Sequence, residues 1–394
     1  MNSILFKNAR LIFPDRIEPK GDLRVEDGRI AVVAPALSPN PGETVVDLGG
    51  RYLAPGFIDM HLHGAMGGDT MEATPETFET ICRFHASGGT TALALTTITA
   101  PMEEIVAVLR TAAEFRKQEP TGARLLGIHV EGPYFSKEKP GAHLPELICN
   151  PSPGHYKPLL EWATGTDNVM IQMTLAPELP GALGLIDALR ERGVRVSGGH
   201  SNAWDDEACA GFVHGMEGAT HTFNCMSTAR RRGPYREAGL LEFVLSEPGI
   251  VCELIADGRH VSTTLIRMLY FAKGPDGICL ITDATSGAGL AEGTTFRLGE
   301  IDCVVRDGVG LLADGSALAG STATMIQGVR TMVKEANISL VEAIRMATLN
   351  PAKALKFPAK GILQKGADAD LVILSDDLEV EATYVQGKPV YNRS

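Results

Sequence analysis

Eight short apolar runs recur along the middle of this 394-residue chain, each followed by turn residues or by a helical pattern. The expected strands lie at residues 57–61, 92–96, 125–131, 169–175, 194–197, 218–221, 250–256 and 278–283. Periodicity predicts helices at residues 75–87, 102–118, 182–192, 204–214 and 262–273, the first of them with Thr74 as N-cap and Pro75 at its first position. Eight strands alternating with helices over about 250 residues are typical of a TIM barrel.

Polar residues decide between this barrel and a doubly wound open sheet, which is the alternative for the same alternation. They stand at or just past the ends of expected strands: Asp59, His61, Glu131, His200, His221 and Asp283. In a closed barrel these strand ends converge on one face, where barrel active sites lie, whereas an open sheet would spread them along a wide edge. The sequence therefore predicts a (β/α)8 barrel.

The two ends of the chain have a different pattern, of short alternating strands separated by turns. Neither end is long enough to bury a core alone. We therefore expect residues 1–53 and 358–394 to pair into one small β-sandwich domain, with the barrel occupying residues 54–357. A further β-rich stretch at 294–313 separates the eighth expected strand from helices expected near 321–336 and 339–349.

Composition narrows the classes of partner. The net charge of −12 argues against non-specific nucleic-acid binding, which needs a basic surface to displace counterions. The sequence has no apolar run of about eighteen residues and no secretory signal pattern at its amino terminus. Its seven cysteines include no C-x-x-C pair, and their odd number argues against a disulfide framework. We expect a cytoplasmic protein with no membrane or nucleic-acid partner.

The strongest local signal is H-L-H-G at 61–64, directly after the first expected strand. Histidines at i and i+2 in extended backbone point to the same side, so His61 and His63 can meet one cation; two unrelated polar residues are the alternative. Glu131, in H-V-E-G-P, ends an apolar strand, where a divalent cation would offset the cost of burying its charge. His129, two residues deeper, is expected to pack or to support the site rather than bind metal.

Three more expected strands end in residues that can bind metal or transfer protons. His200 in G-G-H-S and His221 in A-T-H-T-F-N each end a strand, and Asp283 in L-I-T-D-A-T ends the eighth. One such histidine is more often hydrogen-bonded structure than a ligand, but two on successive strands beside Glu131 favour a metal site. A carboxylate beside that site, such as Asp283, can take a proton from the attacking water and pass it to a leaving amine. Together these residues predict a metal-dependent hydrolase.

These motifs, with A-D-G-x-H at 256–260 and M-A-T-L-N-P-A-K-A-L at 346–355, resemble the amidohydrolase superfamily and, within it, the N-acetylglucosamine-6-phosphate deacetylase family. The resemblance covers essentially the whole chain and implies hydrolysis of an amino-sugar phosphate to acetate and the free amine. It implies that Asp283 is the general base and acid. The same resemblance implies a principal divalent ion (zinc, iron, cobalt or manganese) on Glu131, His200 and His221. A second ion on His61 and His63 would make one or two ions per subunit.

The resemblance also implies the substrate contacts. His143 would touch the substrate near the amide, whereas Asn224, the backbone of Cys225, and His260 would hold the sugar phosphate. Arg236 aligns best as the phosphate ligand, because the guanidinium fork matches two phosphate oxygens. The neighbouring arginines are expected to form a solvated loop: Arg230, Arg231 and Arg232. In the family this loop reaches across a dimer interface, so we expect a homodimer.

Three departures from the family pattern leave the sugar open. Cys225 replaces the usual alanine, Ala238 the usual proline, and the run of arginines is unusual. N-acetylgalactosamine 6-phosphate is therefore an alternative substrate. A cyclic amidase or deaminase is a second alternative, which Arg236 and His143 fit less well. A non-catalytic scaffold is a third, and the presence of every candidate metal ligand argues against it.

Overall fold

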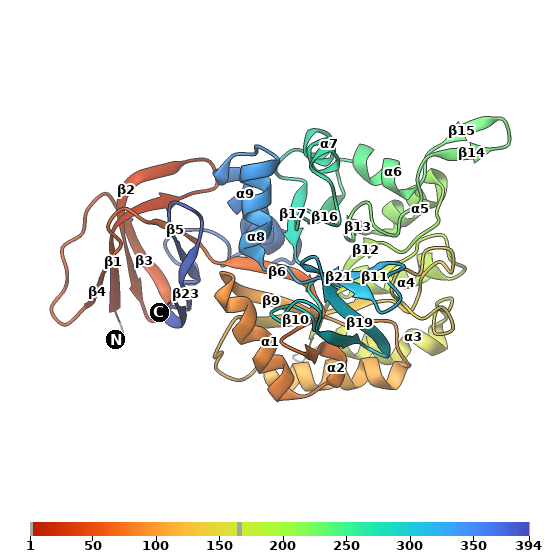
Figure 1. Ribbon diagram of the computed structural model, residues 1–394, viewed down its shortest axis with the longest axis horizontal. Helices are drawn as coiled ribbons and strands as arrows, with labels where there is room; N and C mark the ends of the chain where they lie inside the picture. Colours follow the sequence, from red (N-terminus) through yellow and green to blue (C-terminus); the bar gives the residue numbers. More distant parts are fainter. Residues whose placement is uncertain (1–2, 164–167, 394) are drawn as a thin grey trace.

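The computed structural model describes residues 3–163 and 168–393, and a parallel barrel stands at its centre (Figure 1). Its eight strands are hydrogen-bonded in the order β17-β16-β13-β12-β11-β10-β9-β6, which confirms the predicted barrel. The strands are β6 (Phe57–Leu62), β9 (Thr90–Thr96), β10 (Arg124–Glu131), β11 (Met170–Leu175), β12 (Arg195–Gly198), β13 (Met216–Ala219), β16 (Val251–Ile255) and β17 (Ile278–Ile281). β13 ends two residues earlier than the run at 218–221 predicts, so His221 lies on the loop beyond it.

Polar contacts close the barrel between its first and last strands, β6 and β17. The backbone N–H of Asp283 donates to the carbonyl of His61 at 2.9 Å, and the Thr282 hydroxyl donates to the Asp59 carboxylate at 2.6 Å. Burial raises the pKa of Asp59 to about 7, against the lowering effect of its hydrogen bonds from Thr282. This closure excludes the open sheet and brings the ends of β6 and β17 together.

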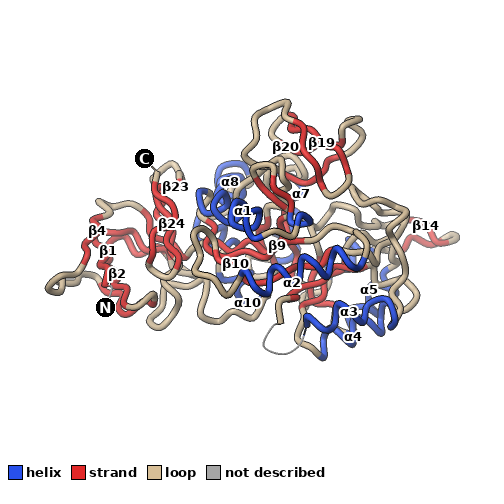
Figure 2. Tube along the Cα trace, turned by 90° about the horizontal axis from the view of Figure 1, so that it is seen from below, coloured by secondary structure: helices blue, strands red, loops and turns tan. Residues whose placement is uncertain are grey.

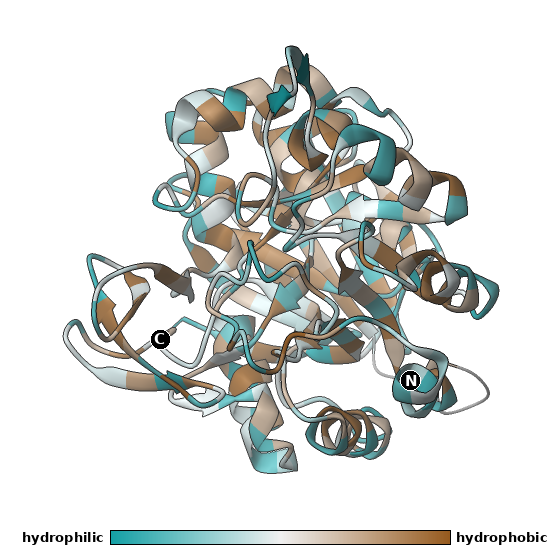
Figure 3. Ribbon diagram, turned by 90° about the vertical axis from the view of Figure 1, so that its right-hand side faces the viewer, coloured by the Kyte–Doolittle hydropathy of each residue, from teal (hydrophilic) through white to brown (hydrophobic). Residues whose placement is uncertain are grey.

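Helices surround the barrel, as Figures 1 and 2 show. They are α1 (Pro75–Ser87), α2 (Met102–Phe115), α3 (Pro153–Leu160), α4 (Ala182–Glu191), α5 (Asp205–His214), α6 (Leu240–Ser246), α7 (Thr263–Lys273), α8 (Met325–Arg330), α9 (Leu340–Ala347) and α10 (Leu349–Ala354). The Thr74 hydroxyl caps α1 by accepting from the N–H of Thr77, as predicted. Helices α3, α6 and α10 were not predicted, because α3 contains Pro158 and the other two have only 7 and 6 residues. The hydropathy colouring shows apolar strands at the centre and polar segments on the outer helices (Figure 3).

Both ends of the chain build a second sheet at the left of Figure 1. Its eight strands are β1 (Ser3–Ile12), β2 (Ile17–Glu26), β3 (Arg29–Ala34), β4 (Thr44–Asp47), β5 (Tyr52–Pro55), β22 (Leu371–Leu374), β23 (Val380–Val385) and β24 (Lys388–Asn392). β5 pairs with β1 and β22, so it joins the two ends of the chain. The sheet has its own apolar cluster, in which Phe6 and Tyr384 pack edge to face. A separate β domain made from both termini is thus confirmed, whereas its limits at residues 53 and 358 stay a prediction.

Three small antiparallel sheets extend from the barrel in the described residues, and the shortest is the hairpin of β7 (Gly64–Ala65) and β8 (Gly68–Asp69). A four-stranded antiparallel sheet follows β17, in place of the single stretch expected at 294–313. Its strands are β18 (Thr295–Leu298), β19 (Ile301–Arg306), β20 (Val309–Leu312) and β21 (Leu318–Ser321). The hairpin of β14 (Arg230–Arg232) and β15 (Tyr235–Glu237) projects from the barrel at the upper right of Figure 1. In the described part of the chain, no helix has the length and apolar character needed to cross a bilayer.

Candidate active site

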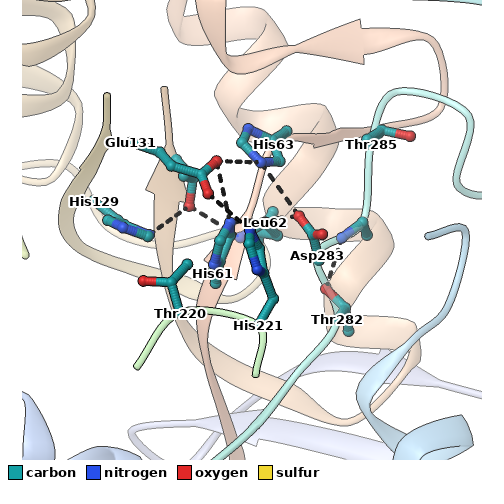
Figure 4. Close-up of polar contacts among 12 residues, drawn as sticks. His61, Leu62, His63, His129, Glu131, Thr220, His221, Thr282, Asp283 and Thr285 are labelled. Carbon is teal, nitrogen blue, oxygen red and sulfur yellow. Dashed lines mark hydrogen bonds and ion pairs between the residues drawn. The ribbon is translucent and has the colours of Figure 1, made fainter. Parts of the chain in front are cut away.

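The predicted metal ligands lie together where the barrel strands end. Figure 4 shows His61, His63 and His221 gathered around Glu131, with Asp283 beside them. His61 belongs to β6 and His63 follows it, Glu131 ends β10, and His200 and His221 lie just beyond β12 and β13. Asp283 lies two residues beyond β17. All six side chains are buried, with Asp283 the most exposed at 8 %. The barrel therefore brings together the polar residues that the sequence places at separate strand ends.

Three of these residues have left-handed backbone, with φ of 47° at His200, 30° at His221 and 51° at Asp283. Left-handed φ values are uncommon for residues other than glycine, and they concentrate at functional sites. The change from extended to left-handed backbone turns the chain out of the strand direction at each position. The backbone strain indicates that the fold holds these side chains at the barrel mouth for a functional reason.

Glu131 stands between two pairs of histidines. Its Oε2 atom lies 3.5 Å from His61 Nε2 and 3.3 Å from His63 Nε2. Its Oε1 atom lies 3.4 Å from His200 Nε2 and 3.2 Å from His221 Nε2. Glu131 forms one group with His61 and His63 and another with His200 and His221. Within each group, the atoms able to bind a metal lie within 4.8 Å of one another. Glu131 can thus contribute one oxygen to each of two neighbouring cation sites.

The donor set fits a divalent cation. Within the described residues, His61 Nε2 and Glu131 Oε1 are buried atoms with no hydrogen-bond partner, although nitrogen and oxygen atoms surround them. The Nε2 atoms of His200 and His221 lie 3.0 Å apart, within hydrogen-bond distance, and each also faces Glu131 Oε1. Buried polar atoms without a hydrogen-bond partner leave a desolvation cost, which a coordinated cation removes. Imidazole and carboxylate ligands suit zinc, iron, cobalt and manganese.

The carboxylates make this cluster strongly attractive to positive charge. Burial would raise the pKa of Glu131, but the adjacent His61, His200 and His221 hold it well below its usual range. The same balance holds for Asp283, whose pKa is lowered by His61 and His63. Asp283 Oδ1 lies 3.4 Å from His61 Nε2 and 3.3 Å from His63 Nε2. Both carboxyl groups are therefore ionised at neutral pH.

A buried carboxylate inside the barrel, Glu253, orients His61. Its Oε2 atom lies 3.1 Å from His61 Nδ1, and its Oε1 atom accepts a hydrogen bond from Gln172 Nε2 at 2.7 Å. In the neutral ring, a proton on Nδ1 leaves the Nε2 lone pair of His61 directed toward Glu131. Glu253 was not predicted as a site residue, although its position within the apolar run 250–256 was a signal for it.

His129 stays outside the cluster of ligands, as predicted. Its Nε2 atom lies 2.7 Å from the Thr174 hydroxyl, and its ring packs edge to face on His61 with centroids 4.6 Å apart. Burial holds the pKa of His129 well below its ordinary value. The side chain is therefore a neutral packing partner of the candidate ligand His61.

His143 faces Glu131 from the loop that follows β10. Its Nδ1 atom accepts the backbone N–H of Thr99 at 3.2 Å, so its Nε2 atom carries the hydrogen of the neutral ring. Burial, together with the nearby His200, holds the pKa of His143 well below its usual value. The Nε2 atom lies 3.7 Å from Glu131 Oε2. His143 therefore offers an N–H donor beside the candidate metal ligands.

The other predicted substrate contacts divide into two groups. A pocket of about 290 Å³ over the cluster is lined by Asn224, Cys225 and His260, together with His143 and Asp283. The His260 Nδ1 atom lies 2.7 Å from Asp257 Oδ2, and this carboxylate raises the pKa of His260 against the effect of burial. Arg236 is exposed on the projecting hairpin and is not among the described residues that line the pocket.

The neighbouring arginines also lie on this hairpin. Arg230 is half-buried over the Trp204 ring and donates to the carbonyl of Asn202, whereas Arg232 pairs with Asp206 and Glu237. Arg231 pairs in register with Arg236 across the two strands and is exposed. The run thus lies on an ordered hairpin, on which Arg231 and Arg232 are exposed to solvent.

A closed parallel barrel with buried histidines and carboxylates at its strand ends is the arrangement of a barrel hydrolase. Residues 52–390 match the model of the amidohydrolase family, and the chain belongs to this family of metal-dependent hydrolases.

Individual relatives narrow the comparison. The chain is 35 % identical to an N-acetylglucosamine-6-phosphate deacetylase of Vibrio furnissii over 88 % of this chain and 85 % of that one. It is also 35 % identical to an N-acetylgalactosamine-6-phosphate deacetylase of Escherichia coli O157:H7, over 93 % of both chains. Among solved structures, N-acetylglucosamine-6-phosphate deacetylase from Pasteurella multocida superposes with a TM-score of 0.91 at 33 % identity, covering 99 % of this chain and 100 % of that chain.

Proposed function

We propose that this protein removes the acetyl group from N-acetylglucosamine 6-phosphate, giving glucosamine 6-phosphate and acetate. The observation that carries the proposal is the position of Asp283, an ionised carboxylate 3.3 Å from His63 on the edge of a cluster able to hold two cations. The names of the relatives from Vibrio furnissii and Pasteurella multocida support the same substrate.

Five residues would bind the metal ions that amide hydrolysis needs. Glu131, His200 and His221 would hold the principal ion, and His61 and His63 with Glu131 a second. When bound, a divalent ion supplies a nucleophilic water at neutral pH and polarises the amide carbonyl. The number of ions, one or two, follows from whether His61 and His63 bind metal.

Asp283 and His143 act on opposite sides of the amide. The Asp283 carboxylate accepts a proton from the attacking water as the new carbon–oxygen bond forms, and it returns that proton to the nitrogen as the carbon–nitrogen bond breaks. The Nε2–H of His143 donates to the carbonyl oxygen, where negative charge develops. The pocket residues Asn224 and His260 bind the sugar, and the raised pKa of His260 favours its cationic form near an anionic substrate.

Sugar preference is tested by comparing epimers. The relative from Escherichia coli O157:H7 is named for N-acetylgalactosamine 6-phosphate. It is 35 % identical to this chain, as is the relative from Vibrio furnissii that is named for N-acetylglucosamine 6-phosphate. We expect metal-loaded enzyme to release acetate from the glucosamine substrate faster than from the galactosamine epimer, and chelator-treated enzyme to release it from neither. Faster release from the epimer would assign the alternative substrate, and activity on a cyclic imide alone would assign a cyclic amidase.

The hairpin supports a homodimer. Arg236 is exposed on β15, outside the pocket of its own chain, so a guanidinium that binds the substrate phosphate would have to come from a second copy. We expect equilibrium sedimentation to give a dimer, and Arg236→Ala to raise KM more than it lowers kcat. A monomer with full activity would contradict this assembly.

A further inference from the structure

A second cavity adjoins the pocket over the metal ligands. Its volume is about 470 Å³, against about 290 Å³ for the pocket itself. Two side chains, Ile98 and Leu298, line both spaces. Ile98 lies two residues beyond β9, and Leu298 ends β18 of the inserted sheet. These two side chains therefore form the wall between the two spaces.

The wall is well packed. Ile98 is 5 % exposed and Leu298 is 3 % exposed, and both belong to one apolar cluster with Ala142 and Met71 at its edge. The Ile98 backbone N–H also points to Met71 Sδ at 3.4 Å. Close packing from both elements holds the wall in one position, because interiors leave few voids for a side chain to move into.

The geometry of His143 places the acyl group of the substrate at this wall. Thr99, the neighbour of Ile98, donates to His143 Nδ1 at 3.2 Å, and Ala142 precedes His143 in the chain. Under the proposed function, His143 binds the carbonyl oxygen of the amide. The methyl group on that carbonyl carbon must then lie within a few ångströms of the His143 ring, where Ile98, Leu298 and Ala142 supply apolar surface. Much of the rest of the pocket lining consists of histidines and carboxylates, which suit the polar sugar.

The cavity beyond the wall is able to take an alkyl chain. Met71, Leu144 and Leu147 line it with apolar surface. The buried carboxylate of this cavity, Asp69, accepts hydrogen bonds from the backbone N–H groups of Met71 and Gly299 at 2.8 Å each. The exposed carboxylates Glu104 and Glu300 belong to its lining as well.

We propose that Ile98 and Leu298 set the length of the acyl group that the enzyme removes, and that the cavity behind them is a latent site for longer acyl chains. The inference rests on the proposed function. In the native enzyme the wall accommodates acetyl and excludes longer groups; a smaller side chain at position 98 or 298 joins the two spaces.

The test measures kcat/KM of metal-loaded enzyme on glucosamine 6-phosphate acylated with acetyl, propionyl or butyryl groups. For the native enzyme we expect each methylene beyond acetyl to lower kcat/KM by about 10- to 200-fold. Ile98→Ala and Leu298→Ala should each raise the butyryl-to-acetyl ratio by at least about tenfold, with Ile98→Val intermediate. Ile105→Ala is the matched control, because Ile105 is fully buried in α2 and lines neither space.

The outcomes separate this inference from the function on which it rests. A native enzyme that fails to release acetate contradicts the proposed function and the inference together. A native enzyme that removes butyryl as well as acetyl overturns the inference alone. The inference is also overturned if the butyryl-to-acetyl ratio is unchanged in Ile98→Val and in whichever alanine variant retains acetyl activity. An equal rise of this ratio in Ile105→Ala would overturn it as well.

Discussion

Replacing Glu253 by glutamine should weaken metal binding without touching a metal ligand. Glu253 has two carboxylate oxygens, one 3.1 Å from His61 Nδ1 and the other 2.7 Å from Gln172 Nε2. A glutamine has only one oxygen, and its NH2 group cannot accept the hydrogen of either partner. One charge-assisted bond is therefore lost, which is worth about 1.5–3 kcal/mol. Either orientation of the amide also removes the negative charge beside His61, so we expect affinity for the ion bound there to fall about 10- to 100-fold.

Metal content after dialysis and competition titration with a chromophoric chelator measure this effect. We expect Glu253→Gln to lose the ion held through His61 and His63 while keeping its far-UV circular dichroism. Asp22→Asn serves as a control, because Asp22 is also a buried, hydrogen-bonded carboxylate. It belongs to the terminal sheet, which is separate from the barrel sheet that carries the candidate metal ligands. Equal metal affinity in Glu253→Gln and native protein would refute the reasoning, as would an equal loss in Asp22→Asn.

Three further predictions concern the terminal sheet, a helix cap and the hairpin. The Arg24 hydrogen bonds lower the pKa of Glu43 from 4.5 to about 2, so Glu43→Gln should reduce the free energy of unfolding by about 1.5–3 kcal/mol at pH 7. Because a lowered pKa stabilises the fold above the unfolded value, urea titrations should show this difference shrinking as the pH falls from 4.5 toward 2. Thr74→Ala removes the cap on the N–H of Thr77 and should cost about 0.5–2 kcal/mol in the same assay, and no loss would contradict the capping role. Arg236→Lys should raise KM for the phosphorylated substrate if the bidentate fork matters, whereas an unchanged KM would exclude it.

The sequence was most informative where local chemistry and the barrel agree. Thr74 and Pro75 mark the start of α1, since capping depends on a few neighbouring residues. His61, Glu131 and Asp283 could be assigned to one site because parallel strands in a barrel end on one face, so three distant positions converge once the fold is known.

The sequence was least informative where the contact depends on packing between distant segments. Glu253 is the one charged residue in an apolar strand, but only the closed barrel places it beside His61. Leu298 belongs to a stretch that the sequence identified only as β-rich, and its place beside Ile98 follows from how the inserted sheet folds onto the barrel. The position of Arg236 outside its own pocket likewise depends on the ordered hairpin that its neighbours form.

The most direct test of the proposed chemistry compares acetate release from N-acetylglucosamine 6-phosphate by native enzyme and by Asp283→Asn, each with its metal content measured. The amide of the variant keeps the shape of the side chain but cannot accept the proton of the attacking water. We expect equal metal content and a loss of kcat of about 100- to 10,000-fold, the usual contribution of general acid–base catalysis. Near-native turnover by metal-loaded Asp283→Asn, or no turnover by the native enzyme, would contradict the account.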